Sequence, residues 1–186
     1  LGYRFEEKPR RPFLPEKAEA LGVPAGPVRR DLVNGETITL ANGQVVHPDD
    51  VLGPPRPGVS IAITGDTGEV DTLVDPVRGV DLLICEATYL ARDRAMAQRF
   101  GHLTAEQAAW LAAEAGVRML ALNHLSQRYR IRDILAECRP IFENTYAARD
   151  FDRFKITRDK ITLSNQQLND DESLIEQGDA IDAADL

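Results

Sequence analysis

The sequence predicts an α/β protein, and three observations support this class. Apolar segments at 59–64, 80–85 and 117–123 have the composition of buried strands, and segments with helical periodicity come between and after them. Each apolar segment runs into polar residues at its C-terminal end. A proline-rich stretch precedes all three. We therefore expect a sheet whose carboxyl edge carries the chemistry, with an insertion before it.

Two amphipathic helices are predicted after the second and third strands. The first follows Thr104, which resembles the N-cap of a capping box, and ends at Gly116. The second covers about 131–138, where apolar residues recur at helical spacing. Short final strands are expected at 144–148 and 151–156.

The stretch 5–58 holds nine of the eleven prolines and looks unlike a compact core. We predict one short helix at 16–21 and a hairpin around the Asn-Gly turn at 42–43. Between 8 and 30, six basic residues face two glutamates, a local charge of +4. The pattern fits either a solvated loop or an arm that meets a polyanion, and charge alone does not decide between them. The basic residues considered for that contact are Arg10, Arg11, Lys17, Arg29 and Arg30.

The net charge of −8 comes almost entirely from the end of the chain. Residues 164–186 contain seven acidic and no basic residues, which leaves −8 − (−7) = −1 for the rest. The overall charge therefore does not exclude a nucleic-acid partner. Residues 164–186 have few large apolar side chains, so we predict a disordered acidic tail.

Two other sequence features bear on location. No apolar run approaches the roughly 20 residues that a membrane helix needs, so no membrane partner is expected. Cys85 and Cys138 each lie in an apolar segment without paired spacing, which favours reduced, buried thiols and a cytoplasmic protein.

Four polar side chains are predicted to converge at one edge of the sheet. Asp66, Glu86 and His124 follow the three strands, and His102 comes just before a helix. Asp66 and His124 are a sensible pair of zinc ligands because zinc takes carboxylate and imidazole donors. Without further residues, a turn-capping Asp and a hydrogen-bonding His are the more common interpretations.

Four motifs together resemble the ribonuclease Z family, the tRNA 3′-processing endonucleases of the metallo-β-lactamase superfamily. They are Gly-Asp-Thr at 65–67, Glu-Ala-Thr at 86–88, Gly-His-Leu-Thr at 101–104 and His-Leu-Ser-x-Arg-Tyr at 124–129. The resemblance extends over about residues 2–157. It implies the C-terminal half of an αββα sandwich with a protruding proline-rich arm. The corresponding organisation is a domain at 1–163 with an arm insertion at 5–50, followed by the acidic tail.

The resemblance also implies a role for each converging residue. Asp66 matches the carboxylate that bridges two zinc ions, and His124 matches a ligand of one of them. His102 matches a catalytic histidine near the scissile phosphate, and Glu86 matches the residue that orients it. The arm and its basic residues match the segment that grips precursor tRNA, and the family implies a homodimer.

Two departures from the family pattern stand out. Cys85 occupies a position where the family commonly has His, and no His-x-His-x-Asp-His motif occurs. The remaining histidine, His47, is a poor ligand candidate because it lies in the proline-rich stretch. We therefore expect a fragment, inactive alone, of a zinc-dependent endoribonuclease that removes 3′ trailers from precursor tRNA. The alternatives are another phosphodiesterase of the superfamily or a non-catalytic RNA-binding remnant.

Overall fold

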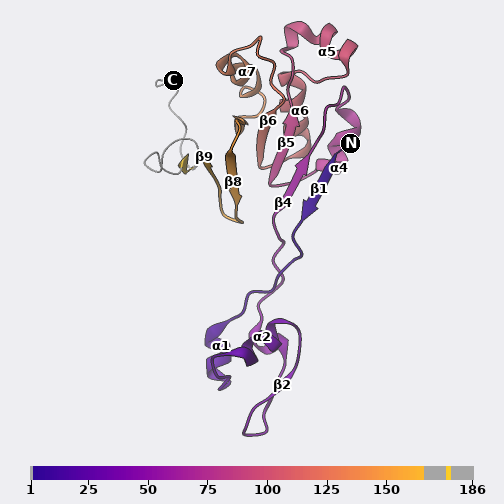
Figure 1. Ribbon diagram of the computed structural model, residues 1–186. Helices are drawn as coiled ribbons and strands as arrows, with labels where there is room; N and C mark the ends of the chain where they lie inside the picture. Colours follow the sequence, from indigo (N-terminus) through magenta and orange to yellow (C-terminus); the bar gives the residue numbers. More distant parts are fainter. Residues whose placement is uncertain (1, 166–174, 177–186) are drawn as a thin grey trace. The chain divides into compact units, whose positions relative to one another are not determined.

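The computed structural model describes residues 2–165 and 175–176, which form two compact units (Figure 1). The first unit contains the residues up to Glu6 together with those from Val59 onward, and we call it the sheet unit. The second unit is Glu7–Gly58, and we call it the proline-rich unit. It begins and ends later than the predicted arm at 5–50.

The sheet unit is built on a five-stranded sheet in the order β1-β4-β5-β6-β7. Neighbours from β4 to β7 are parallel, while β1 runs antiparallel to β4. The three predicted strands are thus neighbours, and the prediction is confirmed. The start of the chain adds a further strand, β1, to one side of them. The strands are β1 (Tyr3–Glu6), β4 (Ser60–Ile63), β5 (Leu82–Glu86), β6 (Met119–Asn123) and β7 (Thr145–Ala147).

Helices share the main core with one face of this sheet. The predicted capping box of α6 is present, and Gly116 ends the helix in a left-handed conformation. Among the described residues, no helix is long and apolar enough to cross a membrane. The helical elements are η1 (Asp71–Leu73), α4 (Val74–Val77), η2 (Ala91–Asp93), α5 (Arg94–Phe100), α6 (Ala105–Ala115) and α7 (Ile131–Cys138).

A second sheet packs on the opposite face. It has the order β10-β9-β8, and its strands are β8 (Asp152–Ile156), β9 (Ile161–Asn165) and β10 (Ile175–Glu176). Alternation along the strands sends Leu83 to the helix side and Leu82 to the side shared with Ile161. The resulting layers are helices, sheet and sheet. This layering confirms the α/β class, as part of an αββα sandwich.

The end of the described chain differs from the expected tail. Ser164 and Asn165 lie in β9, and Ile175–Glu176 pair with the same strand. Residues 166–174 and 177–186, which make up most of the predicted acidic tail, lie outside the described residues.

The proline-rich unit has a core of its own, so the expectation that this stretch lacks one was wrong. Pro15, Pro27 and Pro48 each occupy the first position of a helix, where no backbone N–H is needed. The elements are α1 (Pro15–Ala20), α2 (Pro27–Val33), β2 (Ile38–Thr39), β3 (Val45–Val46) and α3 (Pro48–Val51). The buried residues are Ala18, Val23, Leu32, Ile38, Val46, Val51 and Leu52.

Candidate metal centre

Three parallel strands end at the same edge of the sheet and place three of the predicted residues there. Glu86 is the last residue of β5 and pairs in register with Asn123, the last residue of β6. His124 follows directly. After β4, the chain turns through Gly65 and presents Asp66. The predicted convergence of these side chains is confirmed by the strand register.

His102 reaches the same edge from the segment between α5 and α6. Gly101 ends α5 in the left-handed region, with φ 72°, and redirects the chain. Tyr89, just beyond β5, donates its backbone N–H to the carbonyl of Leu103 at 3.1 Å and holds the segment beside the sheet. The loop that carries Asp66 packs closely here, since a Cβ atom on Gly68 would lie 3.1 Å from Gly101 Cα. The missing side chain of Gly68 therefore lets the two loops approach, while Gly101 supplies the left-handed turn.

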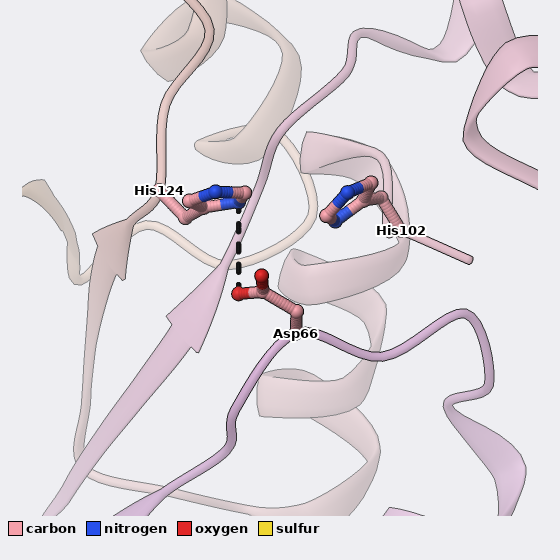
Figure 2. A group of neighbouring side chains, drawn as sticks. All are labelled: Asp66, His102 and His124. Atoms are coloured by element: carbon pink, nitrogen blue, oxygen red, sulfur yellow. Dashed lines mark ion pairs between the residues drawn. The ribbon is translucent and has the colours of Figure 1, made fainter. Parts of the chain in front are cut away.

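Asp66, His102 and His124 form a cluster of metal-ligand type. One ligand atom from each lies within 4.8 Å of the other two, and the three side chains point toward one another (Figure 2). Asp66 and His124 are half-exposed, whereas His102 is 20% exposed. His124 has a φ of 52°, a left-handed conformation that costs free energy for a residue with a side chain. Such local strain is common at functional sites.

Glu86 is the buried centre of the hydrogen bonds behind this cluster. Its side chain is 1% exposed and accepts three donors. The backbone N–H of Thr67 donates to Oε1 at 2.7 Å, and the Thr88 hydroxyl donates to Oε2 at 2.6 Å. His102 Nδ1 lies 3.0 Å from Oε1. One buried carboxylate therefore holds the Asp66 loop and the ring of His102 together.

Known proteins with similar sequences carry the names ribonuclease Z and ribonuclease BN. The chain is 50% identical over 156 residues to a ribonuclease Z of Bradyrhizobium sp. (strain ORS 278). It is 43% identical over 159 residues to a ribonuclease BN of Escherichia coli. The chain is homologous to ribonuclease Z. The first alignment covers 84% of this chain and 52% of the relative, so the chain spans about half the length of the curated relatives it matches.

Family models and solved structures add less to this ribonuclease Z homology. No family model matches the chain. The short form of human tRNase Z is 30% identical in sequence, with a TM-score of 0.40 over 57% of this chain and 34% of that one.

The cluster has the donor chemistry of a metal site. Imidazole and carboxylate donors suit zinc, and three protein ligands are the usual number for one catalytic zinc. No second metal-ligand cluster occurs within residues 2–165 and 175–176. His47 lies in the proline-rich unit, where Nδ1 is 3.2 Å from the Thr37 hydroxyl. The described residues therefore fit one metal ion, and a second ion requires further ligands.

The basic residues predicted to meet tRNA divide into two sets. Arg11 donates to the backbone carbonyls of Gly53 and Leu52, and Arg29 donates to those of Val23 and Pro24. These two arginines therefore support the fold of the proline-rich unit. Three others have exposed side chains and no side-chain hydrogen bond or ion pair to the described part of the chain: Arg10, Lys17 and Arg30.

Thr88 is the site residue that the sequence did not predict. It belongs to the Glu-Ala-Thr motif that supports the ribonuclease Z resemblance, but only its glutamate received a role. Thr88 is buried, and its hydroxyl also lies 2.7 Å from His124 Nδ1. Its position two residues after Glu86, on the same side of an extended chain, was the available signal.

Proposed function

We propose that this chain belongs to a zinc-dependent endoribonuclease that removes 3′ trailers from precursor tRNA. The observation that carries this proposal is the cluster of Asp66, His102 and His124, backed by the buried Glu86, in a chain 50% identical to a ribonuclease Z. Nitrogen and oxygen donors support zinc as the metal. Two ions are proposed for the complete site, with the remaining ligands supplied by residues beyond those described.

The proposed role of each residue follows from which of its side-chain atoms are available to a metal ion or a substrate. Asp66 and His124 would hold metal, which supplies an activated water and neutralises charge on the phosphate. Glu86 binds His102 at Nδ1 and leaves Nε2 as the ring atom available to a substrate. In its doubly protonated form, with Nδ1–H bound to Glu86, His102 would donate the Nε2 proton to the leaving 3′ oxygen. Glu86 keeps the ring in the orientation that this transfer needs.

The proline-rich unit would bind the body of the tRNA. Arg10, Lys17 and Arg30 offer exposed positive charge on a small folded unit. Contacts to phosphates position an RNA without reading its sequence. The presence of this second, basic unit supports a macromolecular substrate over the alternative of a small phosphate ester, because a small ester needs no second binding unit.

The second alternative is a non-catalytic RNA-binding protein. Against it stands the network around Glu86, which brings a buried carboxylate, two imidazoles and a constrained backbone to one place. Burying a charged group is costly unless it is fully paired, and binding RNA through surface charge requires no such group. The network therefore supports catalysis. Homodimer assembly and a cytoplasmic location remain predictions.

The test is to join the chain to the part of the Bradyrhizobium ribonuclease Z that its alignment leaves out. We expect the joined protein to cleave precursor tRNA in the presence of zinc, and Asp66→Ala to abolish this cleavage. Asp71→Ala is the matched control, since Asp71 is exposed and outside the cluster. Cleavage that survives Asp66→Ala would contradict the proposed site.

The 186-residue chain by itself gives the complementary measurement. Two predicted ligands, or three if His102 also binds metal, leave the proposed two-metal site incomplete. We therefore expect weak zinc binding by calorimetry and no cleavage of precursor tRNA. Tight binding of stoichiometric zinc, or turnover by this chain alone, would show that the described residues suffice.

A further inference from the structure

The Thr88 hydroxyl links the buried carboxylate to the exposed histidine of the cluster. It lies 2.6 Å from Glu86 Oε2 and 2.7 Å from His124 Nδ1, both within hydrogen-bond distance. Thr88 is 9% exposed and Glu86 is 1% exposed, so water cannot readily replace the contact between them. The path Glu86–Thr88–His124 is therefore a continuous chain of hydrogen bonds.

The number of available protons fixes which atom donates and which accepts in each hydrogen bond of this path. A threonine hydroxyl has a single hydrogen to donate, and an ionised carboxylate can only accept. The hydrogen therefore goes to Glu86, and the hydroxyl oxygen must accept from His124. His124 then carries its proton on Nδ1 and presents an unprotonated Nε2.

Asp66 does not offer an equivalent contact to this nitrogen. Its Oδ1 lies 3.6 Å from His124 Nδ1, the pair joined by the dashed line in Figure 2. That separation is too long for a hydrogen bond. The 2.7 Å contact with Thr88 is the shorter one and sets the ring.

We propose that Thr88 is a positioning residue that fixes the tautomer and orientation of His124. The lone pair on Nε2 is then available to a metal ion, while Glu86 holds His102 in the same tautomer by direct contact. One buried carboxylate thus governs both histidines, one directly and the other through a hydroxyl. The benefit to metal binding rests on the proposed function, but the tautomer does not.

The tautomer can be read directly by NMR because the chain has three histidines. We would label them with 15N and record long-range 15N–1H spectra without metal or RNA, at a pH above the ordinary histidine pKa of about 6.5. We expect the Nδ1–H form for His102 and His124. His47, in the proline-rich unit, is the internal control.

Two substitutions at position 88 separate the hydroxyl from the shape of the side chain. Thr88→Val keeps the volume but removes the hydroxyl, so His124 should lose its preference for the Nδ1–H form. Thr88→Ser keeps the hydroxyl and should restore that preference. The spectra of His102 and His47 should change little in either variant.

Glu86→Gln gives a sharper prediction, because it should reverse the relay. Thr67 and His102 both donate to Oε1, so the amide oxygen should take that place and the NH₂ group should face Thr88. The hydroxyl would then accept from the amide and donate to His124 Nδ1. We expect His124 to change to the Nε2–H form while His102 keeps its proton on Nδ1.

Zinc titration in the same spectra supplies a second measurement. Loss of a group that orients a metal-binding histidine typically lowers metal affinity about 10–100-fold. We expect such a loss for Thr88→Val and near-normal affinity for Thr88→Ser. An Nε2–H tautomer of His124 in the unaltered chain would overturn the proposal, as would an unchanged tautomer in both Thr88→Val and Glu86→Gln. Failure of tRNA cleavage would count against the proposed function alone.

Discussion

In the sheet unit, the carboxylate that holds the cluster together is buried, whereas in the proline-rich unit the unpaired positive charges all face outward. Glu86 is 1% exposed and accepts three donors. Arg10, Lys17 and Arg30 are exposed and have no side-chain partners in the described chain. The side chains of the cluster must lie at fixed distances from one another, and a buried hydrogen-bond network in a low-dielectric environment holds them there. Basic side chains that bind a long polyanion need only be accessible to it.

The sheet unit also buries its thiols, and their reactivity is where we expect the largest effect. Both cysteines lie in the sheet unit, and burial raises the pKa of each from 9.0 to about 12. At neutral pH this lowers the reactive thiolate fraction by about a thousandfold. We expect native Cys85 and Cys138 to resist iodoacetamide, and mass spectrometry to show labelling only after denaturation.

The same pKa shifts predict how stability depends on pH. A thiol whose folded pKa is raised contributes fully to stability below its unfolded pKa of 9.0 and loses that contribution as the pH rises toward about 12. The urea midpoint of the sheet unit should therefore fall above pH 9.

In the iodoacetamide experiment, rapid labelling of the native chain at neutral pH would contradict the burial of these thiols.

Core substitutions test whether the two units are stable independently. Leu32 and Leu120 are both fully buried, the first in the proline-rich unit and the second in the sheet unit. Replacing a buried leucine by alanine costs about 2–5 kcal/mol. We expect Leu32→Ala to lower the denaturation midpoint seen in the His47 NMR signals and to leave Cys85 protected. Leu120→Ala should expose the thiol first.

If either variant lost the native His47 NMR signals and the protection of Cys85 at the same denaturant concentration, the two units would not be independently stable. The outcome matters because the two units were identified from separate packing, with separate cores. If they unfold together, the proline-rich unit is part of one cooperative domain.

The smallest effect is expected from the surface charges. In the joined enzyme, replacing Arg10, Lys17 and Arg30 by alanine should raise KM for precursor tRNA several-fold. The salt dependence of binding should weaken by about one unit of slope for each phosphate that no longer meets a basic side chain. Turnover of a small phosphodiester should not change, because that substrate needs only the cluster.

Arg29→Ala is the matched control for charge. It removes one positive charge but also breaks the hydrogen bonds to Val23 and Pro24, so it should destabilise the proline-rich unit. If the exposed triple variant also loses small-ester turnover, those residues support the fold and the proposed tRNA contact fails.

Much of the sheet unit could be predicted because its signals are local. The capping box at Thr104 and the apolar strands ending in polar residues are readable along the chain, and parallel pairing then brings Asp66, Glu86 and His124 together. The identity of the hydroxyl beside His124 depends on the separation of two side chains 36 residues apart. No pattern along one strand contains that distance.

The proline-rich unit was harder to predict because proline has opposite meanings inside and at the start of a helix. Pro15, Pro27 and Pro48 interrupt the sequence pattern, yet each begins a helix. The division of the arginines was also hidden, since the carbonyls bound by Arg11 lie 41 and 42 residues away. Charge density predicted the basic surface and could not tell which arginines are internal.

The pairing of β1 with β4 makes the proline-rich unit an insertion into a hairpin. Glu6 lies opposite Ser60 in an antiparallel register, and the whole of Glu7–Gly58 leaves and returns between these two positions. Because the ends are neighbours in the sheet, a two-residue Asn-Gly turn could join them without moving either strand. The fold is therefore modular at this point, and evolution can enlarge, exchange or delete the inserted module while the sheet edge that carries the metal cluster keeps its framework.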